Sequence, residues 1–143
     1  MRKNLWMVVA ATSLAIGTAF AQAPAKTEVT SDAPVGALNE CYDTLGDQPR
    51  TALQPCLERK TSEALAQMHI AYKKLEAGTK EVDSSSTPKA LASLLASQQA
   101  FEAFKDAQCQ WTGDAMMGGS GSGDVVSACK VDLIRWRTTQ LSD

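Results

Sequence analysis

Two amphipathic segments between residues 88 and 141, separated by a glycine-rich break at 118–123, constrain this chain most strongly. In both segments the apolar residues recur at steps of three, four or seven, which is the period of an α-helix and not of a β-strand. These positions are Leu94, Phe101, Phe104 and Trp111 before the break and Val126, Cys129, Leu133 and Trp136 after it. The pattern predicts two helices that pack their apolar faces together as an antiparallel hairpin.

The N-terminus predicts export. Arg2 and Lys3 precede an apolar run over residues 5–20, and Ala19-Phe20-Ala21 has the small residues that a signal peptidase requires. The run is shorter than the about 20 residues that span a bilayer, and polar residues interrupt it. Residues 1–21 are therefore predicted to be a signal peptide, cleaved near Ala21 to give a periplasmic or secreted protein. No cysteine lies near this site to accept a lipid, so we expect no membrane anchor.

The charge of the exported chain bears on its partners. Cleavage removes Arg2 and Lys3, which leaves 12 of the 14 basic residues against 16 acidic ones, a net charge of −4. A mildly acidic protein is a poor match for nucleic acid or an anionic membrane surface, but it is compatible with a basic protein partner. The length suits one small domain, and the sequence leaves its oligomeric state open.

The cysteines predict disulfides. All four lie in the exported part, and an even number of cysteines in an oxidising compartment favours disulfides over free thiols. The chain has no CxxC pair and only one histidine, so the spacings of a zinc site are missing and we expect no metal. Of the three possible connectivities we favour the one in which each pair brackets a predicted turn. These pairs are Cys41 with Cys56 and Cys109 with Cys129.

The rest of the chain adds a leader and two helices. Residues 22–34 show no periodicity and are predicted to be a disordered leader, so the domain covers 35–143. A short helix is expected over 35–45, ended by Gly46, and a long one over 53–75, in which Pro55 marks either the start or a kink. Residues 78–87 are predicted to be a loop, and Pro88 suits the first turn of the next helix. The fold class is all-α, a small disulfide-stapled bundle of about four helices.

The sequence provides no set of catalytic residues. His69 is the only histidine, and a lone helical histidine is most often packed or solvated. The glycine-rich segment lacks the preceding strand and the closing Gly-Lys-Ser/Thr of a phosphate-binding loop, and Met116 and Met117 have no third soft ligand beside them. We therefore expect no cofactor and no enzymatic activity.

Two groups of residues are candidates for binding. The first is a polar cluster that helical spacing gathers on one side of the third helix, with one arginine from the fourth; its members are Gln98, Glu102, Lys105, Asp106 and Arg137. The cluster is a solvated face, a structural tie between Asp106 and Arg137, or a binding site for a partner. The second is a candidate loop whose polar edges would project toward a partner; it comprises Asp114, Gly118, Gly119 and Asp124.

The chain resembles the LprI-like lysozyme inhibitor family. The resemblance lies in Leu94 to Gln98, Phe101, Phe104-Lys105-Asp106 and Cys109, followed by glycines and by Cys129, Leu133, Arg137 and Leu141; Cys41, Cys56-Leu57 and Tyr72 extend it to residues 38–141. The chain departs from the family at four positions, with Lys105 for Arg, Phe101 for Trp, Gln99 for Arg and Ile134 for Thr. A lysine at position 105 lacks the guanidinium group, whose paired N–H donors bind a partner with two hydrogen bonds. The replacement therefore weakens a binding site built on that group, but it does not affect a role of the side chain in packing.

This resemblance implies an exported helical domain and, for the member that names the family, inhibition of lysozyme. We therefore expect a binding protein that blocks the cleft of a lysozyme or related peptidoglycan-cleaving enzyme. The alternative is a non-inhibitory structural or envelope-assembly domain of the periplasm.

Overall fold

The computed structural model describes residues 36–143, so the expected signal peptide, its cleavage site and the leader lie outside the described residues. The described part consists of α1 (Ala37–Leu45), a short 3-10 helix η1 (Arg50–Ala52), α2 (Leu53–Glu81), α3 (Thr87–Asp114) and α4 (Ser122–Ser142). It contains no strand, which confirms the all-α prediction.

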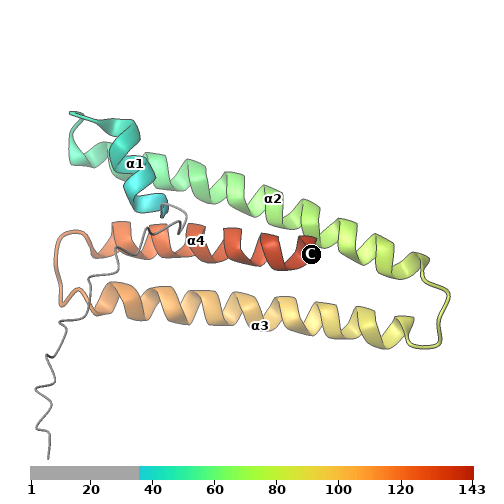
Figure 1. The fold of residues 1–143 in the computed structure, drawn as a ribbon. Coiled ribbons are helices and arrows are strands. Elements are labelled where there is room, and N and C mark those ends of the chain that lie inside the picture. Colours follow the sequence, from blue (N-terminus) through green and yellow to red (C-terminus); the bar gives the residue numbers. More distant parts are fainter. Residues whose placement is uncertain (1–35) are drawn as a thin grey trace, which may run out of the picture. The chain divides into compact units, whose positions relative to one another are not determined.

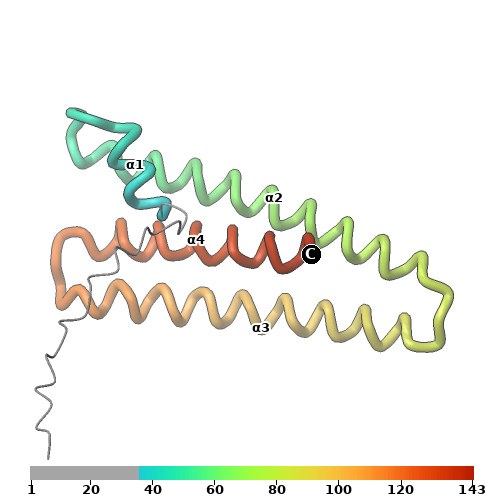
Figure 2. Tube along the Cα trace, viewed as in Figure 1, coloured from blue at the N-terminus to red at the C-terminus, as the bar shows by residue number. Residues whose placement is uncertain are grey.

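The three long helices run side by side, and α4 lies between α2 and α3 (Figure 1). The α2–α3 turn and the α3–α4 loop are at opposite ends of these helices, as the chain trace in Figure 2 shows. Helix α1 packs against both α2 and α4, whereas α3 makes most of its contacts with α4. Helix α4 is therefore the central element, and α3 is covered by the rest of the domain mainly on one side.

The helix ends follow local chemistry. Gly46 ends α1 with a φ of 53°, a left-handed conformation that glycine adopts without steric cost, and its N–H donates to the Tyr42 carbonyl. Helix α2 begins at Leu53, two residues before Pro55. Pro55 therefore lies in the first turn, where its missing N–H would have had no helical partner, so of the two predicted alternatives the structure favours a helix start over a kink.

The predicted boundary at Gly78 is wrong. Helix α2 continues through this glycine to Glu81, and the loop is confined to residues 82–86. A glycine inside a helix costs only about 1 kcal/mol, and the Lys80–Glu76 pair supports the following turn. Pro88 lies in the first turn of α3, as predicted.

The core lies where α1, α2 and α4 meet. Its largest fully buried side chains include Leu53 and Leu57 from α2 and Val131 and Ile134 from α4. The apolar stripe predicted for α4 is wrong in part, because Trp136 is 52% exposed. The residues of α4 that are removed from water recur at the same helical steps on an adjoining face, which holds Ala128, Val131, Ile134 and Leu141. The physical reason is that α4 packs most extensively against α2, whereas Cys129 and Trp136 of the predicted stripe face α3.

The aromatic stripe of α3 is also only partly buried. Phe101 lies in the core, but Phe104 and Trp111 are 51% and 65% exposed. Both residues therefore lie on a surface of α3 that the described residues leave uncovered.

Both predicted disulfides are present. Cys41–Cys56 joins α1 to α2, and Cys109–Cys129 joins the end of α3 to the start of α4. Within residues 36–143, none of the helices combines the length and the apolar character that crossing a bilayer requires.

Candidate functional site

The predicted polar cluster forms a hydrogen-bonded chain on α3 and α4. The Arg137 Nε donates to Gln98 Oε1 (3.1 Å), the Gln98 amide donates to Glu102 Oε1 (3.0 Å), and Lys105 donates to the other oxygen of Glu102. Lys105 is a buried residue, 8% exposed. A buried ammonium needs a charged partner, so Glu102 is the central member of this chain.

Of the three alternatives for the cluster, the tie between Asp106 and Arg137 is not formed, because each residue has other partners. Asp106 lies 3.6 Å from the Lys130 ammonium and 3.7 Å from that of Lys105, and its side chain is 62% exposed. The reason is the register of the hairpin. Arg137 follows Cys129 by eight residues and therefore lies beside Phe101, eight residues before Cys109, whereas Asp106 is only three residues from Cys109.

Arg137 instead covers the end of the cluster. Its guanidinium lies 5.6 Å from the centroid of the Phe101 ring and donates to the Ser97 hydroxyl at 3.0 Å. Sequence reasoning missed Ser97, because nothing in the α3 pattern says which of its polar residues faces α4.

A groove borders the cluster between α2 and α3, with a cavity volume of about 790 Å³. Gln98 and Glu102 form part of one wall, and exposed Ile70 and Leu95 contribute apolar surface. His69 also lines the groove. Among residues 36–143, no group of three or more His, Cys, Asp or Glu side chains is arranged to hold a metal ion.

The α3–α4 loop, residues 115–121, is the second candidate. Met117 is 91% exposed and has a φ of 51°, and Gly118 follows with a φ of 82°. A non-glycine residue in the left-handed region costs about 1 to 2 kcal/mol, so the surrounding turn enforces this conformation. The strained backbone presents a methionine side chain, not the polar groups that the sequence suggested.

The base of the loop is tightly packed. A Cβ atom at Gly113 would lie 2.3 Å from Val126 Cγ2, so only glycine allows α3 and α4 to approach this closely. The Ser122 hydroxyl donates to the Gly113 carbonyl at 2.9 Å, and Cys109–Cys129 lies one turn behind. The loop therefore projects from a rigid support.

The predicted role of Asp124 as a projecting group is wrong. Asp124 is 8% exposed and accepts hydrogen bonds from the Gln54 amide (2.7 Å) and the Arg50 guanidinium (3.2 Å). It lies in the first turn of α4, whose N-terminal dipole favours a carboxylate. Asp114, the other predicted loop-edge acid, is exposed and accepts from the Gln110 amide at 2.9 Å. Asp124 thus fixes the loop base to α2, and Asp114 alone remains accessible.

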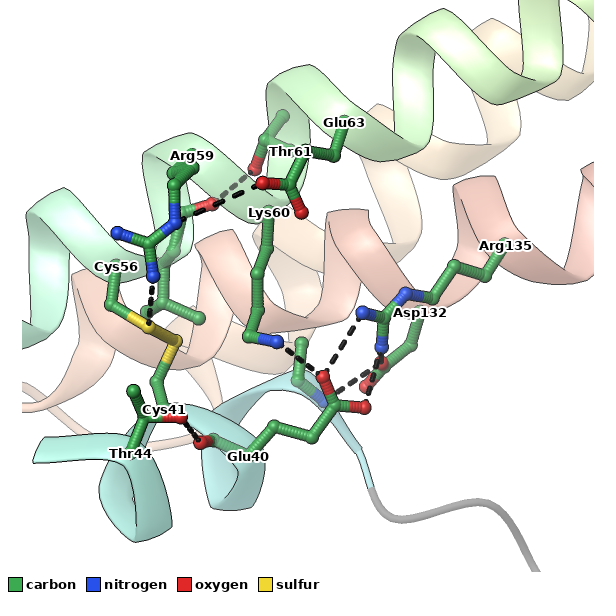
Figure 3. The surroundings of a disulfide bond; sticks show 12 residues. Glu40, Cys41, Thr44, Cys56, Arg59, Lys60, Thr61, Glu63, Asp132 and Arg135 are labelled. Atoms are coloured by element: carbon green, nitrogen blue, oxygen red, sulfur yellow. Dashed lines mark hydrogen bonds and ion pairs between the residues drawn. A yellow bond between two sulfur atoms is a disulfide. The ribbon is translucent and has the colours of Figure 1, made fainter.

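A third polar group surrounds the other disulfide (Figure 3). Glu40 on α1 pairs with both guanidinium nitrogens of Arg135 (2.7 and 3.0 Å) and with the Lys60 ammonium (2.6 Å). The hydrogen bonds from Arg135, together with the one from Lys60, lower the pKa of Glu40 to about 2. Asp132 accepts the first N–H of α1, from Ala37, and burial raises its pKa. These contacts hold α1 in place, and no pattern in the sequence predicted them.

These features define a class: a small, all-helical, disulfide-clamped domain with a groove between two helices and a supported loop. The model of the family described as lysozyme inhibitor LprI matches residues 36–141, and the chain belongs to this family. The match covers all four α-helices except the last residue of α4, together with both disulfides. Neither the comparison with curated proteins nor that with solved structures found a match.

Proposed function

We propose that this protein is exported and inhibits a lysozyme or related peptidoglycan-cleaving enzyme by covering its catalytic cleft. The observation that carries the proposal is the match to the lysozyme inhibitor family over residues 36–141. An inhibitor family is typically non-catalytic, so the protein acts by binding and not by destroying the enzyme. The mild acidity of the chain supports a basic enzyme as the target.

The α3–α4 loop is the element proposed to enter the cleft. A cleft is concave, so the group that blocks it has to project, and this loop lies at one end of the hairpin (Figure 1). Met116 and Met117 are its exposed apolar side chains. Methionine is unbranched and adapts its shape to an irregular surface. The left-handed turn at Met117 and Gly118 holds the backbone of the loop in one conformation, so binding costs little further backbone entropy.

Support for the loop comes from its base. Cys109–Cys129, the Gly113–Val126 contact and the Asp124 hydrogen bonds restrict how α3 and α4 can move at this end. A loop that is already ordered loses little conformational freedom when it binds. Inhibition by such a loop is stoichiometric, because each copy occupies one enzyme.

The test is a titration of bacterial cell-wall lysis by several lysozymes. We expect the oxidised protein to stop lysis by at least one of them at about one equivalent. Replacing Met116 and Met117 by alanine weakens inhibition about tenfold or more, since each buried methionine contributes more than 1 kcal/mol. Val82→Ala is the matched control, because Val82 is an exposed apolar residue in the loop at the other end of α3.

Salt gives a second measurement. If the acidic surface steers association, the association rate falls with ionic strength, because charges are screened over about 10 Å at 0.1 M salt. Asp114→Asn then slows binding more than a change at Lys73 or Lys74 on α2. Failure of every lysozyme tested to bind at micromolar concentration would refute the inhibitor proposal.

The second candidate is a structural or envelope-assembly domain. The groove between α2 and α3 favours it, because a concave apolar surface accepts a protruding segment and does not enter a cleft. Under this alternative, Ile70→Asp in the groove affects envelope integrity in cells, and Met117→Ala does not.

A further inference from the structure

The outward surface of α3 has too little charge for a solvent-facing helix surface. Between Ala90 and Phe101 this helix carries no charged residue, and Phe104 and Trp111 are more than half exposed. A helix on the surface of a soluble domain normally presents polar and charged groups to water. The side of α3 opposite α4 therefore has an uncharged middle that no other part of residues 36–143 covers.

The exposed positions of this surface form two rows at steps of seven. Lys89, Ala96, Ala103 and Gln110 make the first row, and Ser93, Ala100, Ala107 and Asp114 make the second. All eight residues are exposed, and Phe104 and Trp111 lie along the edge of the second row. A seven-residue spacing keeps a row facing a partner helix along its whole length.

We propose that this surface, the α3 face, binds the α3 face of a second copy in an antiparallel dimer. With the twofold axis beside Ala100 and Ala103, each residue of one row meets a residue of the other row in the second copy. The pairs are Lys89 with Asp114, Ser93 with Gln110, Ala96 with Ala107 and Ala100 with Ala103. Cation meets anion, polar meets polar and small meets small in a single register.

Charge complementarity favours a second copy of the chain as the partner and an antiparallel arrangement of the two α3 helices. Lys89 and Asp114 lie at the two ends of α3, and neither belongs to an ion pair within residues 36–143. The antiparallel dimer forms the Lys89–Asp114 pair twice. A parallel dimer would place Lys89 against Lys89 and Asp114 against Asp114, and a shift by seven residues would separate them.

The centre of the face allows a close approach. Alanine at the four central positions lets the two helices pack tightly, and Phe104 and Trp111 then cover the edge of the contact. A single helix pair buries less than the about 1,600 Å² of a standard interface. We therefore expect a reversible dimer that dissociates in the micromolar range.

The experiment is sedimentation equilibrium of the oxidised mature protein from micromolar to millimolar concentration. The expected result is a mass that rises from monomer to dimer. Ala103→Glu puts a charge beside the axis and abolishes the dimer, while Ala77→Glu, at an exposed alanine of α2, leaves it unchanged. Circular dichroism and the melting temperature establish that both variants remain folded.

Charge reversal tests the register. Lys89→Asp, or Asp114→Lys, weakens dimerisation about tenfold because two attractive pairs become repulsive. The double variant restores it to within about threefold of the unaltered protein.

Three results would overturn the proposal. These are a monomer throughout the concentration range, a dimer that Ala103→Glu leaves intact, and a double variant as weak as the single ones. A monomeric protein in which Ala103→Glu abolishes lysozyme inhibition would assign the α3 face to the enzyme instead. The proposal does not depend on the inhibitor function, since self-association is measured without any lysozyme.

Discussion

The two disulfides differ in their surroundings, because one lies beside the packed core and the other beside an exposed loop. Around Cys41–Cys56, Glu40 binds Lys60 and Arg135 and the fully buried Leu53 and Leu57 fill the core, so many contacts hold α1 besides the disulfide. Around Cys109–Cys129 the hairpin ends in an exposed loop, and α3 contacts the rest of the domain mainly through α4. The first region stabilises the fold, and the second supports a projecting element.

This difference shows that the contacts that stabilise the fold and the exposed loop lie in separate parts of the domain. A strained left-handed methionine and an exposed apolar tip are costly, so they persist only where rigid neighbours hold them. The hydrogen bonds from Arg50 and Gln54 to Asp124 connect the start of α2 to the base of the loop. The stable region therefore also supports the region proposed to bind.

Removing each disulfide in turn should give the largest effects. Either pair of Cys→Ser substitutions should cost about 3 kcal/mol of unfolding free energy, because each disulfide closes a loop of similar length. Loss of Cys109–Cys129 should also abolish inhibition, while loss of Cys41–Cys56 should leave it in any protein that remains folded. Urea denaturation and inhibition titrations measure the two quantities. Equal loss of inhibition in both variants would contradict the comparison.

Glu40→Gln should have an intermediate effect on the first region. Because the pKa of Glu40 is lowered to about 2 from 4.5, its contribution is complete above pH 4.5 and is lost as the pH falls toward 2. At neutral pH the substitution should cost about 1 to 2 kcal/mol of unfolding free energy. At pH 2 the variant and the unaltered protein should be nearly equal in stability. A stability difference that is the same at both pH values would show that the ion cluster is not responsible.

The smallest effects should come from the polar cluster on α3. Glu102→Ala should cost about 1 kcal/mol or more of unfolding free energy, because it leaves the buried Lys105 ammonium with only the more distant Asp106. Asp106→Ala should cost less than about 0.5 kcal/mol, since its pair with Lys130 is exposed to water. Thermal unfolding of the two variants measures whether Glu102→Ala lowers the stability more than Asp106→Ala does. A double-mutant cycle of Asp106 and Arg137 should give no coupling energy.

Helical periodicity was sufficient to predict the hairpin, because a period near 3.6 excludes strands wherever it persists. The even number of cysteines and the turns between them predicted both disulfides correctly. The predictions failed where a residue had to be assigned to one side of a helix. Asp114 and Asp124 are both acids at a helix end beside the same loop, yet Asp114 is exposed and Asp124 is buried against Arg50 and Gln54.

The helical class, the disulfides and the resemblance to the lysozyme inhibitor family could be predicted from the residues alone, because each of these depends on spacing along the chain. Packing in three dimensions makes α4 central, puts Arg137 over Phe101 and lets Glu40 hold α1. It also leaves Trp111 and the α3 face uncovered by the rest of residues 36–143. The physical reason is that periodicity fixes the faces of a helix, whereas packing against several neighbours decides which of those faces is removed from water.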